Sequence, residues 1–136
     1  MVDVTVIIGN VGLQLFILLL LAFSSYMAHS RKMKIHCSLM GAALFMQLLA
    51  IVFVMYPSFS AFSGMQISSQ LLVELWVHHI AGILVMLLVI YINLAVKGSV
   101  HFLGEPYRLM RPVVLLWFLV LLGGLHIYIS LYPALS

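Results

Sequence analysis

Six histidines stand out in a chain of 136 residues in which only six basic and three acidic side chains carry a formal charge. A neutral imidazole is a common axial ligand of haem iron and of other metals. A haem with two axial imidazoles binds them from opposite faces of the porphyrin. Histidines that share a depth on different helices would therefore predict haem groups held inside a helical bundle.

The composition excludes a soluble globular protein. The chain is 65% apolar and 7% charged, and its mean hydropathy is +1.26, whereas soluble domains are about 45–50% apolar and about 25% charged. Six basic residues without a long stripe exclude a nucleic-acid-binding protein. The single cysteine, Cys37, excludes an intrachain disulfide. The first ten residues lack the basic region of a cleaved signal peptide, so we expect them to begin a retained span.

Four apolar runs predict four membrane-spanning helices. Each run approaches the roughly 20 residues that cross a bilayer, and none shows the alternation of a barrel strand. The expected bounds are about 4–28, 35–56, 70–96 and 111–132. Pro112 suits the first turn of the last helix, where its missing N–H is not needed. Because short connections make neighbouring helices antiparallel, we expect an all-α integral membrane up-down four-helix bundle, with residues 1–136 as one domain.

The basic residues predict the orientation of the bundle. All six lie between spans one and two or between spans three and four, at Arg31, Lys32, Lys34, Lys97, Arg108 and Arg111. The positive-inside rule places these two connections in the cytoplasm. The two termini and the loop 58–69 are then outside. We expect a multi-pass protein in the plasma membrane of a prokaryote.

The histidines fall into two layers when their depths are compared at about 1.5 Å per residue. The outer layer, about 10–12 Å below the outer surface, contains His78, His79 and His126, and the inner layer contains His29, His36 and His101. Neighbours on a helix point about 100° apart, so either His78 or His79 faces a shared site. Up to two bis-histidine haems b are expected: His79 with His126 outside, and His36 with His101, or alternatively His29, inside.

Small residues accompany the outer candidates. Gly82 lies three residues after His79 and Gly123 three before His126, which places each glycine on the face of its histidine. Such glycines either leave room for a porphyrin or serve helix–helix contact. An ionisable residue deep inside a span is a functional candidate by default, which favours His79 and His126. Histidines at helix ends, in contrast, often lie at the headgroup level without a ligand.

Other polar residues allow two interpretations each. Glu74 could accept a hydrogen bond from a ligand imidazole or be a solvated residue at a helix end. Gln47 either bonds between helices or lies near a cofactor. Met40 is either a thioether ligand near His36 or a packing residue. Arg108 meets lipid headgroups or pairs with haem propionates.

Three segments carry a family resemblance: KIHCSLMGAALF (34–45), WVHHIAG (76–82) and WFLVLLGGLHIYISLYP (117–133). With a His followed four residues later by a Met, and with W, G and Y recurring in the last span, they resemble a family of small four-helix integral membrane proteins of bacteria and archaea. Some members assist the maturation of haem–copper oxidases. The resemblance covers about the last hundred residues. It implies that His36 and His79 are the family positions.

The chain departs from the family pattern at two places. Tyr107-Arg108 stands where the family usually has a His-Arg pair, and His101 lies upstream of it. His126 replaces a residue that is small and apolar in the family. A deep His126 opposite His79 adds a possible second axial ligand, which points toward a b-type cytochrome.

The sequence therefore supports three hypotheses about function. The first is a membrane electron-transfer protein with up to two haems and a quinone or respiratory-chain partner, in which a homodimer would shield the haems. The second is an assembly factor that handles haem or copper for a terminal oxidase without a stable redox role. The third is a structural subunit whose histidines only form hydrogen bonds. No motif of a hydrolase or nucleotide-binding enzyme is present, so we expect no enzyme.

Overall fold

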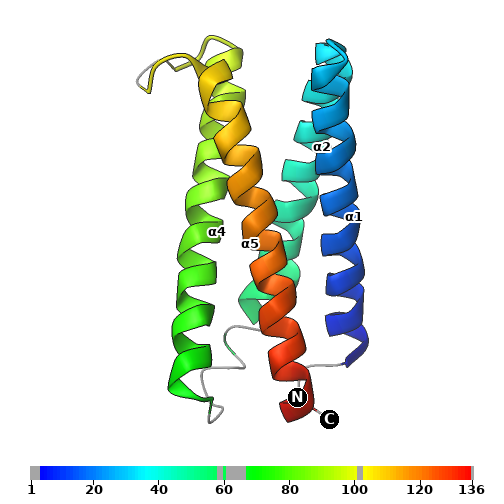
Figure 1. The fold of residues 1–136 in the computed structure, drawn as a ribbon, viewed down its shortest axis with the longest axis vertical. Coiled ribbons are helices and arrows are strands. Elements are labelled where there is room, and N and C mark those ends of the chain that lie inside the picture. Colours follow the sequence, from blue (N-terminus) through cyan, green and yellow to red (C-terminus); the bar gives the residue numbers. More distant parts are fainter. Residues whose placement is uncertain (1–3, 58–59, 61–66, 101–102, 136) are drawn as a thin grey trace. The chain divides into compact units, whose positions relative to one another are not determined.

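The computed structural model describes residues 4–57, 60, 67–100 and 103–135. In this part of the chain, four long helices and one π-helical turn follow one another (Figure 1). They are α1 (Val4–His29), α2 (Met33–Ala50), η1 (Ile51–Met55), α4 (Ser69–Val96) and α5 (Pro106–Leu135). The chain divides into two compact units, residues 1–66 and 67–136, each of which is an antiparallel helical hairpin.

The helices confirm the expected fold class. Among the described residues, four segments are long and apolar enough to cross a membrane: Ile8–His29, Met33–Met55, Ser69–Val96 and Pro106–Leu131. The chain is therefore an all-α, multi-pass membrane protein with the four helices of the expected bundle. The cytoplasmic side and the prokaryotic plasma membrane stay predictions.

The first hairpin turns directly after α1 through a left-handed residue. The N–H of Lys32 donates to the carbonyl of Met27 at 2.9 Å, and that of Arg31 donates to Ala28 at 3.0 Å. This double closure is the usual end of a helix whose next residue is left-handed, a position that glycine normally fills. Here Arg31 fills it, with φ of 58°.

The interface between α1 and α2 carries polar residues along its length. The buried stripe of α1 contains Ile17, Leu21 and Ser24, which recur at three- and four-residue spacing, as one helix face requires. The facing stripe of α2 contains His36, Ala43, Gln47 and Ala50. The end of this span was expected as part of one α-helix, but Ile51–Met55 forms a π-helical turn.

The second hairpin begins and turns with conventional caps. The Ser68 side chain accepts a hydrogen bond from the Leu71 N–H at 3.3 Å at the start of α4, as an N-cap serine does. Gly98, with φ of 78°, follows the end of α4, and the Ser99 N–H donates to the Leu94 carbonyl at 2.9 Å. Glycine adopts this conformation without steric cost.

The start of α5 corrects a sequence-based prediction. The helix begins at Pro106 rather than near residue 111. Pro106 takes the first helical position, for which its fixed φ is suited. Pro112 is therefore inside the helix, where its missing N–H leaves the Arg108 carbonyl without the usual partner.

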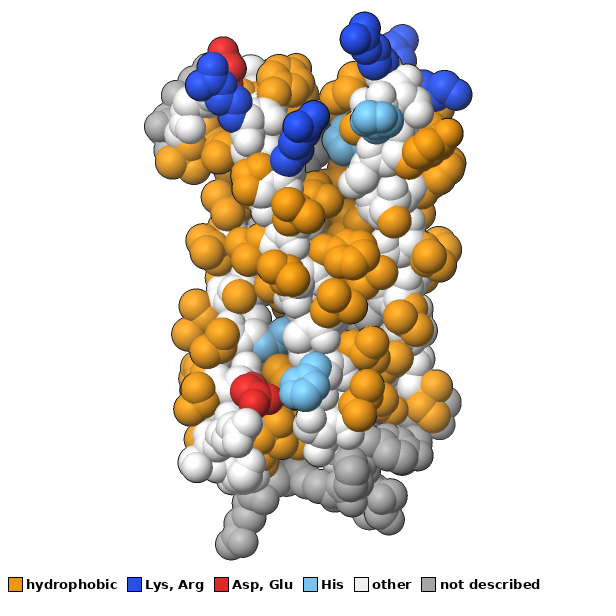
Figure 2. All heavy atoms as spheres, viewed as in Figure 1, with side chains coloured by type: hydrophobic (Ala, Val, Ile, Leu, Met, Phe, Trp, Pro, Cys, Tyr) orange, Lys and Arg blue, Asp and Glu red, His pale blue; other side chains and the backbone are white. Residues whose placement is uncertain are grey.

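The core of the α4–α5 interface is apolar. Its most buried side chains are hydrophobic: Val85, Val89 and Trp117, each with at most 1% exposed. In each hairpin, by contrast, Lys and Arg side chains gather at the end where its two helices are connected (Figure 2). This distribution is the one on which the predicted orientation depends.

Candidate histidine sites

His36 fastens the two helices of the first hairpin. Its side chain is buried, with 5% exposed, and its Nδ1 lies 2.8 Å from the Ser24 Oγ and 3.0 Å from the Ser24 carbonyl oxygen. The Ser24 hydroxyl in turn donates to the His36 carbonyl at 3.2 Å. Three polar contacts thus join α1 and α2 near their connection.

These contacts select one tautomer of His36. A carbonyl oxygen only accepts hydrogen bonds, so the contact with the Ser24 carbonyl requires a proton on Nδ1. In the neutral ring the lone pair is then on Nε2. A histidine that binds a metal commonly has this arrangement, because the N–H of its other nitrogen donates to a carbonyl and orients the ring.

The proposed partners of His36 are placed differently. His29 is the last residue of α1 and is exposed. Met40 lies one turn after His36 in α2 and is half-buried. His101 lies outside the described residues, so its pairing with His36 stays a prediction.

His79 has the same type of contact in the second hairpin. Its Nδ1 lies 2.7 Å from the carbonyl oxygen of Leu75, one turn earlier in α4. The Nδ1–H therefore donates, and the lone pair of the neutral ring is on Nε2. The ring is half-buried, inside a segment long enough to span a membrane. Both His36 and His79 thus have a proton on Nδ1.

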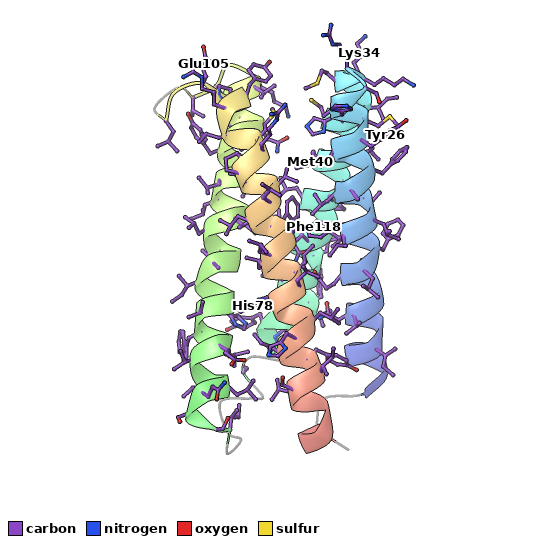
Figure 3. All side chains as sticks on the ribbon, viewed as in Figure 1. Tyr26, Lys34, Met40, His78, Glu105 and Phe118 are labelled. Carbon is purple, nitrogen blue, oxygen red and sulfur yellow. The ribbon has the colours of Figure 1, made fainter. Side chains whose placement is uncertain are left out.

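His78 occupies the contact between α4 and α5 (Figure 3). A Cβ built on Gly124 would lie 2.8 Å from its Cε1, and one on Gly123 would lie 3.9 Å from its Nδ1. Its ring meets the ring of His79 edge-on, with centroids 5.5 Å apart. Its Nδ1 is buried and has no hydrogen-bond partner among the described residues. The two neighbours therefore differ: His78 faces α5, whereas His79 is held to its own helix.

His126 pairs with a carboxylate across the second hairpin. Its Nε2 lies 3.7 Å from Oε2 of Glu74, with the two side chains 71% and 34% exposed. Gln70 donates to the other carboxylate oxygen at 3.1 Å. Glu74 lies five residues before His79 in α4, which turns it about 140° around the helix from that residue. The structure therefore brings His126 to Glu74 on a different side of α4 from His79.

The remaining candidates mostly serve local contacts. Gly82 faces Val120 of α5, whose Cγ1 would lie 3.8 Å from an added Cβ. Gly123, like Gly82, is thus part of the α4–α5 contact. Arg108 forms an exposed ion pair with Glu105 at 3.2 Å. Gln47 is buried in the first hairpin, and its Nε2 lies 3.9 Å from the Met55 sulfur.

The donor set fits an imidazole-ligated haem with one geometric constraint. His36 and His79 each have the orientation of a metal-binding imidazole. At Gly124, however, α4 and α5 are so close that the His78 ring fills the space between them. A porphyrin bound by His79 must therefore lie outside this hairpin contact. No cluster of three or more His, Cys, Asp or Glu residues suited to a metal ion occurs in the described part of the chain.

Two residues of these sites were missed by sequence reasoning. Ser24 was only a polar residue in an apolar run, and Gly124 was one of two adjacent glycines. The spacing of Ser24 to buried Leu21 and Ile17 signals its face, but its partner is twelve residues away on another helix. Gly124 offered no signal beyond its lack of a side chain.

Comparison with known proteins leaves the family open. No family model, curated protein or solved structure matches the chain, so the family resemblance of its last hundred or so residues stays a prediction.

Proposed function

We propose that the chain is a membrane haem-binding protein of the b-type cytochrome kind, with His36 and His79 as axial ligands toward the two membrane faces. The observation that carries this proposal is the 2.7 Å bond from Nδ1 of His79 to the Leu75 carbonyl. It holds an imidazole inside a span with the lone pair on Nε2, where iron would be bound. The haem would supply a reversible one-electron carrier.

The second axial ligands are proposed from the remaining histidines. His126 remains the outer candidate, but within one hairpin it lies on a different side of α4 from His79. A haem with both residues would therefore join two copies of the chain, in agreement with the expected homodimer. At the inner face the candidates are His101 and His29. A respiratory-chain component or a quinone would exchange the electrons.

The test is an absorbance spectrum of the full chain, expressed with ample haem, before and after reduction with dithionite. We expect a Soret band, which falls in His79→Ala and in His36→Ala. The matched control is His78→Asn, which alters the neighbouring residue and leaves the spectrum unchanged. A protein without a Soret band contradicts the proposal. Loss of haem only in the His78 variant would show that His78, not His79, is the outer ligand.

A second candidate function is supported by the exposure of the His126–Glu74 pair. The imidazole is mostly exposed and lies beside a carboxylate. Such a pair is better suited to bind a metal transiently than to hold a cofactor in a closed redox site. The chain would then handle haem or copper during the assembly of a terminal oxidase. A copper titration of the purified protein distinguishes this function: His126→Ala weakens binding, while a stable haem spectrum is absent in the parent chain.

A further inference from the structure

Two buried amide oxygens in the first hairpin have no hydrogen-bond donor. They are the Oε1 atoms of Gln14 in α1 and Gln47 in α2, and neither has a partner among the described residues. Gln47 is 4% exposed. A buried acceptor without a donor costs free energy, and native structures nearly always supply one, from protein or from ligand.

The two glutamines lie at the same level of the hairpin. Ser24 and His36 are in contact, Gln14 lies ten residues before Ser24, and Gln47 lies eleven after His36. Because antiparallel helices rise equally per residue, the two levels differ by only about 1.5 Å. Gln14 shares the stripe of Ile17 and Ser24, and Gln47 shares that of His36, so both belong to the faces that meet.

Each of the two amide nitrogens has one contact elsewhere. Nε2 of Gln14 donates to Oδ1 of Asn10 at 3.3 Å, and Nε2 of Gln47 contacts the Met55 sulfur at 3.9 Å. Each Nε2 therefore has a contact for one of its two hydrogens, whereas the Oε1 of each side chain is an acceptor without a donor among the described residues. The Met55 contact depends on the π-helical turn Ile51–Met55, a distortion that is frequent at functional sites.

The depth of the pair excludes bulk solvent and lipid as donors. Gln14 lies six residues inside the candidate span Ile8–His29, and Gln47 lies eight residues inside Met33–Met55. Lipid tails offer no hydrogen-bond donors at such a depth. A donor for these oxygens has to be a bound molecule or a rearranged side chain.

We propose that Gln14 and Gln47 form a buried binding site for a hydroxyl-bearing molecule, which donates hydrogen bonds to both amide oxygens. A water molecule donates two hydrogen bonds from one centre, and a lipid-soluble quinol donates from its ring hydroxyl. An oxidised quinone, which only accepts, cannot donate to these two oxygens. The site does not depend on haem, because none of the candidate ligands belongs to it.

The proposal is tested by solid-state NMR of the full chain in lipid bilayers, with the glutamine side-chain carbonyl carbons labelled. Of the four glutamines, Gln14, Gln47, Gln66 and Gln70, the signals of the first two are assigned with single Gln→Met variants. We expect contacts between hydroxyl protons and the carbonyl carbons of both Gln14 and Gln47. Contacts in protein without additives, to protons at the chemical shift of water, identify water. Contacts that appear only with menadiol, and not with menadione, identify a quinol-type ligand.

The shared nature of the site is tested in the same samples. In Gln14→Met the hydroxyl contact of Gln47 is lost, or the affinity for menadiol falls about tenfold, because one of two hydrogen bonds is removed. Gln70→Met, which alters an exposed glutamine, leaves both unchanged. Absence of hydroxyl contacts in every sample overturns the proposal, as does a direct amide–amide bond between Gln14 and Gln47. Retention of the Gln47 contact in Gln14→Met overturns the shared site.

Discussion

The two hairpins differ in what their helix interfaces contain. The α1–α2 interface holds every fully buried polar residue in the described part of the chain apart from Tyr91: Ser24, His36 and Gln47. The α4–α5 interface is filled by large apolar side chains such as Val85, Val89 and Trp117. Its histidines lie at the edges of the contact, and only His78 is inserted, opposite Gly124.

This difference shows two ways to fasten antiparallel helices in lipid. Lipid tails are as apolar as leucine, so helices associate through close packing and interhelical hydrogen bonds. The first hairpin uses hydrogen bonds at defined positions, which fix its register. The second uses shape, which makes it sensitive to the volume of each residue at the contact. The predictions below test this contrast.

The largest effect is expected at the tightest contact of the second hairpin. Gly124→Ala places a Cβ 2.8 Å from Cε1 of His78, so the ring or the helices must shift. We expect a loss of about 1–3 kcal/mol in the free energy of unfolding, the usual cost of overpacking. Steric trapping or SDS unfolding in bicelles measures it.

Two variants control this experiment. In Gly123→Ala the new Cβ makes an ordinary contact at 3.9 Å, so the change stays within about 0.5 kcal/mol. Removing the His78 ring in Gly124→Ala/His78→Ala makes the effects less than additive. Equal costs for the two alanines would show that packing at Gly124 does not distinguish this hairpin.

An intermediate effect is expected in the first hairpin. His36→Leu removes both contacts of Nδ1 with Ser24. The Ser24 hydroxyl keeps its hydrogen bond to the backbone carbonyl of residue 36. We expect a loss of about 1–2 kcal/mol, near the upper range for interhelical hydrogen bonds in membranes. Ser24→Ala costs less, because Nδ1 keeps the Ser24 carbonyl at 3.0 Å. A neutral His36→Leu would mean that packing alone holds both hairpins.

The smallest effects have opposite signs at the two helix ends. Arg31→Gly relieves a left-handed residue with φ of 58° and should stabilise the chain by about 1 kcal/mol. Gly98→Ala, at φ of 78°, should destabilise it by a similar amount, about 1 kcal/mol. Arg31→Ala is the control for the lost charge. Because alanine keeps a Cβ, this variant should not raise the free energy of unfolding. The same unfolding assay would refute the prediction if Arg31→Ala and Arg31→Gly were equally stable.

Helix number and type could be predicted because lipid leaves few choices. A run of about 20 apolar residues must satisfy its backbone internally, and a helix does so without partners. Helix ends were less certain: residues 106–110 look like a loop by composition, yet Pro106 begins α5. The π-helical turn Ile51–Met55 had no signal in the sequence, because its residues suit an α-helix equally well.

The sequence predicted the depth of the candidate histidines along their helices but not the neighbour that each side chain faces. Counting residues placed His78, His79 and His126 in one layer, since depth follows from helical rise alone. It did not show that His126 meets Glu74, or that His78 rather than His79 fills the α4–α5 contact. These facts depend on how one helix is rotated against its neighbour.

The sequence by itself determined a four-span membrane protein, because hydrophobicity and length act locally along the chain. The tertiary structure alone decided which polar groups meet, namely Ser24 with His36 and Glu74 with His126. The physical reason is that side-chain contacts between helices depend on rotation and register. Both are set by packing and hydrogen bonds between residues distant in sequence.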